Sequence, residues 1–185
     1  MRRSVLALIS LVAACADAPV ESGTSHDALP NVENPDELGR YVIGSWIIDS
    51  IELALLDEEG QVLTEPTTLY AGEYGSMVFT DGDEALEVQF EGGMIWYEDG
   101  TVATWRKIWS STGDLDLESV VWGEWDPMAE KLQIDSDEFF ARAYVTPLSP
   151  DDMFLDWDDE DSVFDIYSIE LTRVDDSEFS WILSD

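Results

Sequence analysis

Regular alternation of apolar and polar residues is the feature of this sequence that most limits its fold. In the stretch LEVQFE, positions 86–91, every second residue is apolar and the residues between are polar. A period of two places the apolar side chains on one face of a β-strand, whereas an amphipathic helix needs a period near 3.6. Similar segments recur beyond Tyr41, separated by turn pairs such as Asp81-Gly82 and Asp99-Gly100. The pattern predicts an antiparallel all-β domain without long helices.

The number and spacing of these segments predict a closed sheet. Consecutive short strands joined by hairpins form a meander, and closing the meander removes its exposed edges. We therefore expect an antiparallel up-and-down β-barrel of about 8–10 strands. The expected strands cover positions 44–55, 76–80, 85–91, 94–98, 101–109, 117–125, 131–135, 138–146, 153–158 and 163–174.

The first expected strand departs from simple alternation. Trp46 and Ile48 are apolar at even positions, whereas Ile47, Ile51 and Leu53 are apolar at odd positions. Either both faces of this strand are buried, or a β-bulge reverses its parity partway along.

The residues just before this strand have the pattern of a helix start. Asn34 can cap the first backbone N–H groups, Pro35 is accepted in the first turn, and Glu37 lies three residues after the cap. We expect a helix of one or two turns, because Gly39 follows.

The N-terminus has the organisation of an export signal. Arg2 and Arg3 form a positive head, and the nearly apolar run at positions 5–14 is too short to span a bilayer. The sequence VAAC ending at Cys15 resembles the lipobox of bacterial lipoproteins. That resemblance implies a lipidated Cys15 as the first mature residue, and two or more acyl chains hold a protein stably on a membrane. The alternative is an ordinary cleaved signal with an incidental cysteine.

The chain divides into three parts. We expect a signal peptide at 1–14, the lipidated cysteine and a flexible tether at 15–37, and the barrel domain at 38–185. Positions 16–36 are rich in proline, small and acidic residues that cannot build a core. Because Ala16 rather than Asp follows the cysteine, analogy with sorting rules in some Gram-negative bacteria favours the outer membrane.

Cysteine and histidine usage restricts the chemistry. Cys15 is the only cysteine in 185 residues, so the fold must be stable without a disulfide. His26, the only histidine, lies in the expected tether. Haem, histidine-ligated zinc and a histidine general base all need imidazole held in a packed site, so this placement argues against them.

The net charge excludes several kinds of partner. It is −34 for the whole chain, and removing residues 1–14 takes two of the eight basic residues and none of the 42 acidic ones, which leaves −36. Nucleic acid and anionic lipid surfaces would be repelled at low salt. The acidic surface is explained either as a solvated surface suited to salty surroundings or as a binding surface for cations and basic proteins.

Gly44-Ser45-Trp46, after a short helical turn, resembles the Gly-x-Trp motif of lipocalins. Together with MVFTDG, KLQI, FFARAYVTPLSPDDMFLDW and IYSIELTRV, it makes positions 38–174 similar to bacterial lipocalin-like domains often found behind lipoprotein signals. The resemblance implies a barrel of about eight strands with an internal pocket open at one end. It also implies that Trp46 packs across the closed end beneath Arg173 of the last strand, as a structural cation–π pair. The chain departs from lipocalins in lacking their disulfide.

Aromatic residues in the middle strands are the candidate ligand-binding residues. Neither face of positions 101–109 is purely apolar, and rings interleaved with a few polar groups suit a ligand cavity. The alternative is that these tryptophans are simply core, and parity alone leaves open which face points inward. The candidates are Trp96, Trp105, Trp109, Trp122, Trp125, Arg142 and Tyr144.

The run DWDDEDS is the only candidate metal site. Crowded carboxylates suit calcium, which takes six to eight oxygen ligands. The run lacks the central glycine and distal glutamate of an EF-hand loop, and a solvated acidic turn is the simpler explanation. The weak calcium candidates are Asp156, Asp158, Asp159, Glu160 and Asp161.

No motif indicates catalysis. Glu124 in WGEW is compatible with a sugar-binding or glycosidase carboxylate, but with 42 acidic residues chance carboxylate pairs are expected everywhere. No nucleophile motif, phosphate loop or dinucleotide fingerprint occurs. We expect a non-catalytic protein without a resident cofactor, which binds a small hydrophobic or amphipathic molecule. The alternative is a packed acidic envelope module that binds cations or cationic partners, and a pocket of about 300 Å³ or more separates the two.

Overall fold

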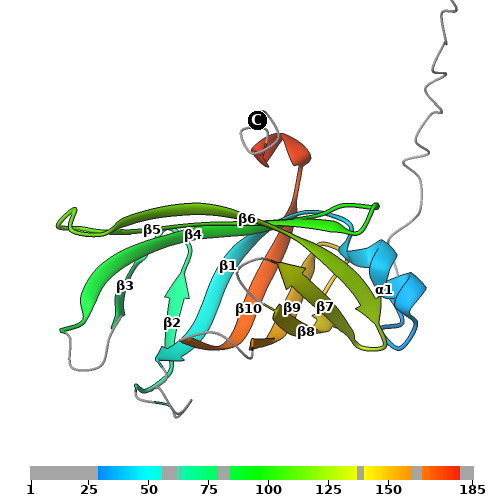
Figure 1. Ribbon diagram of the computed structural model, residues 1–185, viewed down its shortest axis with the longest axis horizontal. Helices are drawn as coiled ribbons and strands as arrows, with labels where there is room; N and C mark the ends of the chain where they lie inside the picture. Colours follow the sequence, from blue (N-terminus) through cyan, green and yellow to red (C-terminus); the bar gives the residue numbers. More distant parts are fainter. Residues whose placement is uncertain are drawn as a thin grey trace, which may run out of the picture.

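A closed antiparallel β-barrel forms the body of the protein in a computed structural model (Figure 1). The structure describes residues 29–55, 62, 64–78, 84–136, 140–159 and 164–179, without the side chains of 55, 158–159 and 164–167. The predicted signal peptide, Cys15 and His26 therefore lie outside the described residues.

The described chain contains one α-helix, ten strands and one 3₁₀ helix. They are α1 (Pro35–Val42), β1 (Gly44–Leu55), β2 (Thr67–Tyr70), β3 (Tyr74–Met77), β4 (Leu86–Trp96), β5 (Thr101–Ser110), β6 (Asp116–Met128), β7 (Lys131–Ser136), β8 (Phe140–Pro147), β9 (Asp152–Asp159), β10 (Phe164–Val174) and η1 (Asp176–Phe179).

Eight of the strands close into a ring, which confirms the predicted up-and-down barrel and is consistent with a lipocalin-like fold. Antiparallel neighbours lead from β1 through β10, β9, β8, β7, β6 and β5 to β4, which pairs back onto β1. The closing ladder runs from Gly44 opposite Trp96 to Ile47 opposite Gly93. Gly93 permits this approach, because a Cβ there would lie 2.7 Å from the carbonyl oxygen of Trp46.

The remaining two strands widen one end of the barrel. Beyond the closing ladder, β1 pairs with β2 and β4 pairs with β3. The strands β2 and β3 therefore lie between the diverging ends of β1 and β4, a region that we call the wedge (Figure 1). The sequence did not predict β2, which is only four residues long and shows no alternation.

The parity change in the first strand is a β-bulge. The pairing of β1 with β10 shifts between Ile48 and Ser50. Trp46 and Ile48 before the shift, and Ile51 and Leu53 after it, are all buried in the main core. The bulge alternative is therefore correct.

One predicted break between strands was wrong, and the strand predicted at 76–80 is β3 at Tyr74–Met77. The sequence predicted separate strands at 85–91 and 94–98, but β4 runs unbroken through Gly92 and Gly93. Both glycines serve close packing instead of a turn. A Cβ on Gly92 would lie 2.9 Å from the ring of Phe90, and Gly93 faces the β1 backbone.

Helix α1 covers one end of the barrel, which we call the closed end. It begins as predicted, with the side chain of Asn34 accepting a hydrogen bond from the backbone N–H of Asp36 at 3.1 Å. Leu38 and Val42 are fully buried and belong to the same core as Trp46. The hydrophobic core therefore continues from the barrel interior into the helix. No helix in the described part of the chain is long and apolar enough to cross a membrane.

Candidate functional site

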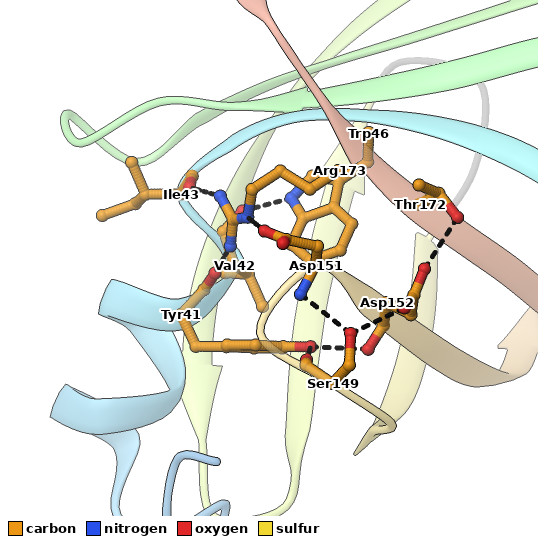
Figure 2. Close-up of polar contacts among 9 residues, drawn as sticks. All are labelled: Tyr41, Val42, Ile43, Trp46, Ser149, Asp151, Asp152, Thr172 and Arg173. Carbon is orange, nitrogen blue, oxygen red and sulfur yellow. Dashed lines mark hydrogen bonds and ion pairs between the residues drawn. The ribbon is translucent and has the colours of Figure 1, made fainter. Parts of the chain in front are cut away.

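The closed end is built around Trp46 and Arg173 (Figure 2). The Arg173 guanidinium lies 4.2 Å from the centroid of the Trp46 ring, which is the pair that the lipocalin resemblance implies. The two residues are opposite each other in the β1–β10 ladder. The indole N–H of Trp46 donates to the carbonyl oxygen of Val42 at 2.8 Å. The pair thus joins the first strand, the last strand and the end of α1.

Arg173 is also held by hydrogen bonds and a carboxylate. Its Nη1 donates to the carbonyl oxygen of Ile43 at 2.7 Å, and its Nη2 donates to the carbonyl oxygen of Tyr41. Its Nε lies 3.8 Å from Oδ1 of Asp151. Burial lowers the pKa of Arg173, while the nearby Tyr41 and Asp151 act in the opposite direction.

Gly44 is required by this arrangement. Its φ is +125°, a conformation that side-chain-bearing residues rarely adopt. A Cβ at Gly44 would also lie 2.7 Å from Nη1 of Arg173. The Gly-x-Trp motif therefore has a physical explanation here, because the glycine leaves the space that the guanidinium occupies.

A second set of hydrogen bonds attaches the β8–β9 turn to the same end (Figure 2). The hydroxyl of Tyr41 points to the carbonyl oxygens of Ser149 at 2.9 Å and Asp152 at 2.8 Å. The hydroxyl of Thr172 lies 2.6 Å from Oδ2 of Asp49 and 2.9 Å from Oδ1 of Asp152. Ser149 donates from its hydroxyl to Oδ2 of Asp152 at 2.6 Å.

The pKa shifts at the closed end follow from this geometry. Burial raises the pKa of Tyr41 to about 12. Hydrogen bonds from the hydroxyls of Ser149 and Thr172 lower the pKa of Asp152 below its usual value of 3.8. These polar groups hold α1, β1, β9 and β10 together, so their role is structural.

The opposite end of the barrel differs, and we call it the open end. Val102 and Ile108 of β5 belong to the interior core, so alternation places Arg106 on the inner face as well. Arg106 is nevertheless exposed, and its Nε donates to the hydroxyl of Ser119 at 3.1 Å. Leu117 on the inner face of β6 is 42% exposed. Inward-facing side chains therefore reach solvent here.

A small cavity lies beside the open end, between β1, β2 and β3. Its volume is about 150 Å³, and Leu53, Thr67, Ser76 and Met77 contribute to its lining. Two wider grooves lie on the outer surface. One of about 410 Å³ includes Trp109, and one of about 640 Å³ between α1 and β6 includes Trp125.

Two predicted ligand-binding residues are part of the core. Trp96 and Trp125 are buried with ring centroids 5.6 Å apart and an interplanar angle of 88°. The indole N–H of Trp125 donates to the carbonyl oxygen of Tyr97 at 3.1 Å. Within the described residues, the buried indole nitrogen of Trp96 has no hydrogen-bond partner.

Three other predicted tryptophans lie on the outer wall, because the odd-numbered positions of β5 and the even-numbered positions of β6 face outward. Trp105 packs on Phe179 of η1 with ring centroids 5.9 Å apart. The ammonium of Lys107 lies 5.7 Å from the Trp109 ring. Trp122 is 49% exposed and stacks on Tyr97, with centroids 6.1 Å apart.

The last two predicted ligand residues are also on the outer wall. Arg142 lies over the ring of Phe140 at 5.4 Å, and the ammonium of Lys131 lies 5.7 Å from the ring of Tyr144. Alternation along β8 places both on the face opposite to the buried Ala141 and Ala143. The structure therefore does not bring the seven predicted residues into one pocket.

The acidic run falls largely outside the described side chains. Asp156 is exposed on the outer face of β9, opposite Ser168. The side chains of Asp158 and Asp159, and the whole of Glu160 and Asp161, lie outside the described residues. No cluster of three or more potential metal ligands occurs in the part that is described. Glu124 is exposed on the outer face of β6.

Sequence reasoning did not identify the residues of the open end or the hydrogen bonds of the β8–β9 turn. Arg106 could have been singled out, because it is a lone cation on the face that carries Val102 and Ile108 in a strongly acidic chain. Nothing in the sequence brings Tyr41 to Ser149, because 108 positions separate them.

Comparison with protein-family models, with curated proteins and with solved structures found no match for this chain.

Replacing Arg173 by Ala should lower the melting temperature by about 5–15 °C. The substitution removes the contact with Trp46 and two hydrogen bonds to partly buried carbonyls, together about 2–4 kcal/mol. Thermal unfolding followed by circular dichroism measures the effect. Arg142→Ala is the matched control, because it removes a cation–π contact on the outer wall and should cost about 1 kcal/mol or less. Equal melting temperatures for the two variants would contradict a structural role for the Trp46–Arg173 pair.

Asp152 should make stability depend on pH in the acidic range. Folding lowers the pKa of Asp152, so the ionised carboxylate adds to the free energy of unfolding at any pH above the pKa of the unfolded chain. That contribution is lost as the pH falls through the lower pKa of the folded protein. Asp152→Asn should therefore be less stable than the wild type at pH 7, and the difference should shrink below about pH 4. Urea unfolding of both proteins from pH 7 to pH 3 measures this. A difference that stays constant over that range would refute the assignment.

Proposed function

We propose that the protein is an exported, lipid-anchored bacterial lipoprotein whose lipocalin-like barrel binds a small, partly hydrophobic molecule without catalysis. The observation that supports binding is the contrast between the two ends of the barrel. The closed end is filled by Trp46 and α1, whereas inward-facing side chains of β5 and β6 reach solvent at the open end. A ligand would enter through the open end.

The chemistry of the open end suits an amphipathic ligand. Apolar and polar side chains are mixed on the inner face, where the apolar groups would supply contact area and the polar groups would orient the ligand. The apolar members are Ile108, Leu117 and Val121, and the polar members are Thr104, Arg106 and Ser119.

Two observations support a non-catalytic role. Among the described residues the large pKa shift belongs to Tyr41, whose hydroxyl is engaged with the β8–β9 turn at the closed end. The sequence contains no motif for a nucleophile, a phosphate loop or a dinucleotide site. Fold alone does not determine function, so the proposal depends on these local features.

The sequence of the N-terminus supports the anchor. A lipobox-like VAAC precedes a proline-rich acidic segment that leads to α1 at the closed end. We place the lipid on Cys15 and the protein at the outer membrane, which Ala16 after the cysteine favours. Because the segment joins the barrel at the closed end, the open end would face away from the point of attachment.

One observation favours a second candidate, a packed acidic envelope module that binds cations or cationic partners. The cavity beside the open end has a volume of about 150 Å³, whereas small-molecule sites usually have about 300 Å³ or more. A ligand would then have to displace side chains at the open end in order to bind.

The anchor is tested by Cys15→Ser in a Gram-negative host. The wild-type protein should sediment with membranes, require detergent for extraction and show added acyl mass, whereas Cys15→Ser should lose all three properties because the thioether cannot form. Thr24→Cys in the Cys15→Ser chain is the control, since a cysteine outside the lipobox should not restore them. Extraction of the wild type by salt alone would rule out the lipid anchor.

The binding site is tested by filling the open end. The fluorescent apolar probe N-phenyl-1-naphthylamine should bind the full chain carrying Cys15→Ser, which needs no competing detergent. Ser119→Trp should weaken binding about tenfold, which corresponds to about 1.4 kcal/mol, because it adds volume on the inner face. Ser50→Trp makes the same change on the outer face of β1 and should leave binding unchanged. A protein that binds no probe would favour the packed acidic module.

A further inference from the structure

Within the part of the chain that the structure describes, a long part of β6 has a neighbouring strand on only one side. β6 pairs with β5 from Asp116 to Glu124, but it pairs with β7 only from Gly123 to Met128. Over the described residues, no strand adjoins the other edge of β6 from Asp116 to Trp122. Figure 1 shows β4, β5 and β6 running together beyond the shorter β7 and β8.

An edge of this length can accept another strand. A strand edge presents a row of N–H and C=O groups that pair with any extended chain that approaches it. Strands in proteins are commonly about five or six residues long, and the stretch from Asp116 to Trp122 is at least that long. Addition of a peptide strand to such an edge is a common mode of recognition.

Side chains beside the edge provide apolar contacts. On the outer face, Val120 is 36% exposed and Trp122 is 49% exposed. Trp122 is held in place by stacking on Tyr97. A cross-strand neighbour placed opposite either residue would bury this surface, which stabilises strand pairs.

The charge along the edge selects the partner. Asp116 and Glu118 are exposed on the outer face, at the other half of the same edge. Glu118 has one basic neighbour, Lys107, at 3.4 Å. Opposite charges directly across a strand pair are favourable and like charges are not, so basic residues suit these positions. A second copy of this chain is disfavoured, because its net charge of −34 would repel the first.

We propose that the Asp116–Trp122 edge of β6 is a docking site for an extended cationic segment of another protein, which adds a strand to the sheet. In an antiparallel arrangement the segment carries two alternate apolar residues opposite Trp122 and Val120, followed by two alternate basic residues opposite Glu118 and Asp116. The proposal concerns the backbone edge and the outer face of β6, whereas the ligand proposed for the interior would contact the inner face of the same strand.

Two labelled peptides test the proposal against the full chain carrying Cys15→Ser. The acetylated and amidated sequences VTVTKTK and KTKTVTV match an antiparallel and a parallel added strand, and VTVTETE is the acidic control. Fluorescence anisotropy should show that one of the two basic peptides binds and that the acidic control does not. Binding of neither basic peptide would overturn the proposal.

Variants with matched controls separate strand addition from general charge attraction. Asp116→Lys and Trp122→Ala should each weaken peptide binding about three- to fivefold, in the upper part of the range that cross-strand pairs contribute. Asp135→Lys makes the same charge reversal at an exposed outer position of β7, and Tyr144→Ala removes an exposed aromatic ring from the outer face of β8. Both should alter binding less than about twofold. Equal weakening by Asp116→Lys and Asp135→Lys would mean charge attraction alone and would refute the site.

Hydrogen exchange on the unmutated edge tests the geometry directly. Peptide binding should slow the exchange of backbone amides in residues 116–122, because added ladder hydrogen bonds protect them. Binding without protection in this segment would refute strand addition. Native mass spectrometry should show a complex of one chain with one peptide. A dimer that forms without peptide, and whose amides in residues 116–122 are already protected, would identify a second copy of the chain as the occupant and would overturn the proposal.

Discussion

The stacking of Arg173 on Trp46 is the interaction on which the rest of the barrel depends. Trp46 belongs to the first strand and Arg173 to the last, and the guanidinium also binds the backbone carbonyls of Tyr41 and Ile43 between α1 and β1. One side chain thus fixes the two ends of the meander and the helix that covers them. Gly44 leaves room for that side chain, and without this space the helix could not turn directly into the first strand.

The difference between the two ends of the barrel originates in β1. At the closed end β1 pairs with both β10 and β4, and the ring contains eight strands. Beyond the bulge after Ile48, β1 moves away from β4, and β2 and β3 enter the wedge. The closed end is consequently narrow and packed, whereas the other end is wider and leaves inner side chains such as Arg106 in solvent. On the other side of the barrel, β6 with 13 residues extends beyond its neighbour β7 with six.

Much of the fold was predictable because it depends on local pattern. Alternation identified most of the strands, the mixed parity of Trp46 and Ile51 required a bulge or two buried faces, and Asn34 marked the helix start. The prediction failed where a glycine pair had two explanations. Gly92-Gly93 has the composition of a turn, but it lies inside a strand, where it allows β1 to approach β4. The candidate site was less predictable, because alternation separates two faces without saying which one is inside.

The sequence by itself determined the all-β class, the barrel topology and the strongly acidic surface. These properties follow from periodicity, turn residues and composition, which are local or additive along the chain. The position of the closing tryptophan was implied by the resemblance of the Gly-x-Trp motif to that of lipocalins. Only the tertiary structure decided that Trp105, Trp109 and Trp122 lie on the outer wall while Trp96 and Trp125 are core. The physical reason is that the inward face of a strand depends on the curvature of the whole closed sheet. That curvature results from pairings between strands far apart in the sequence, such as β1 with β10 and with β4.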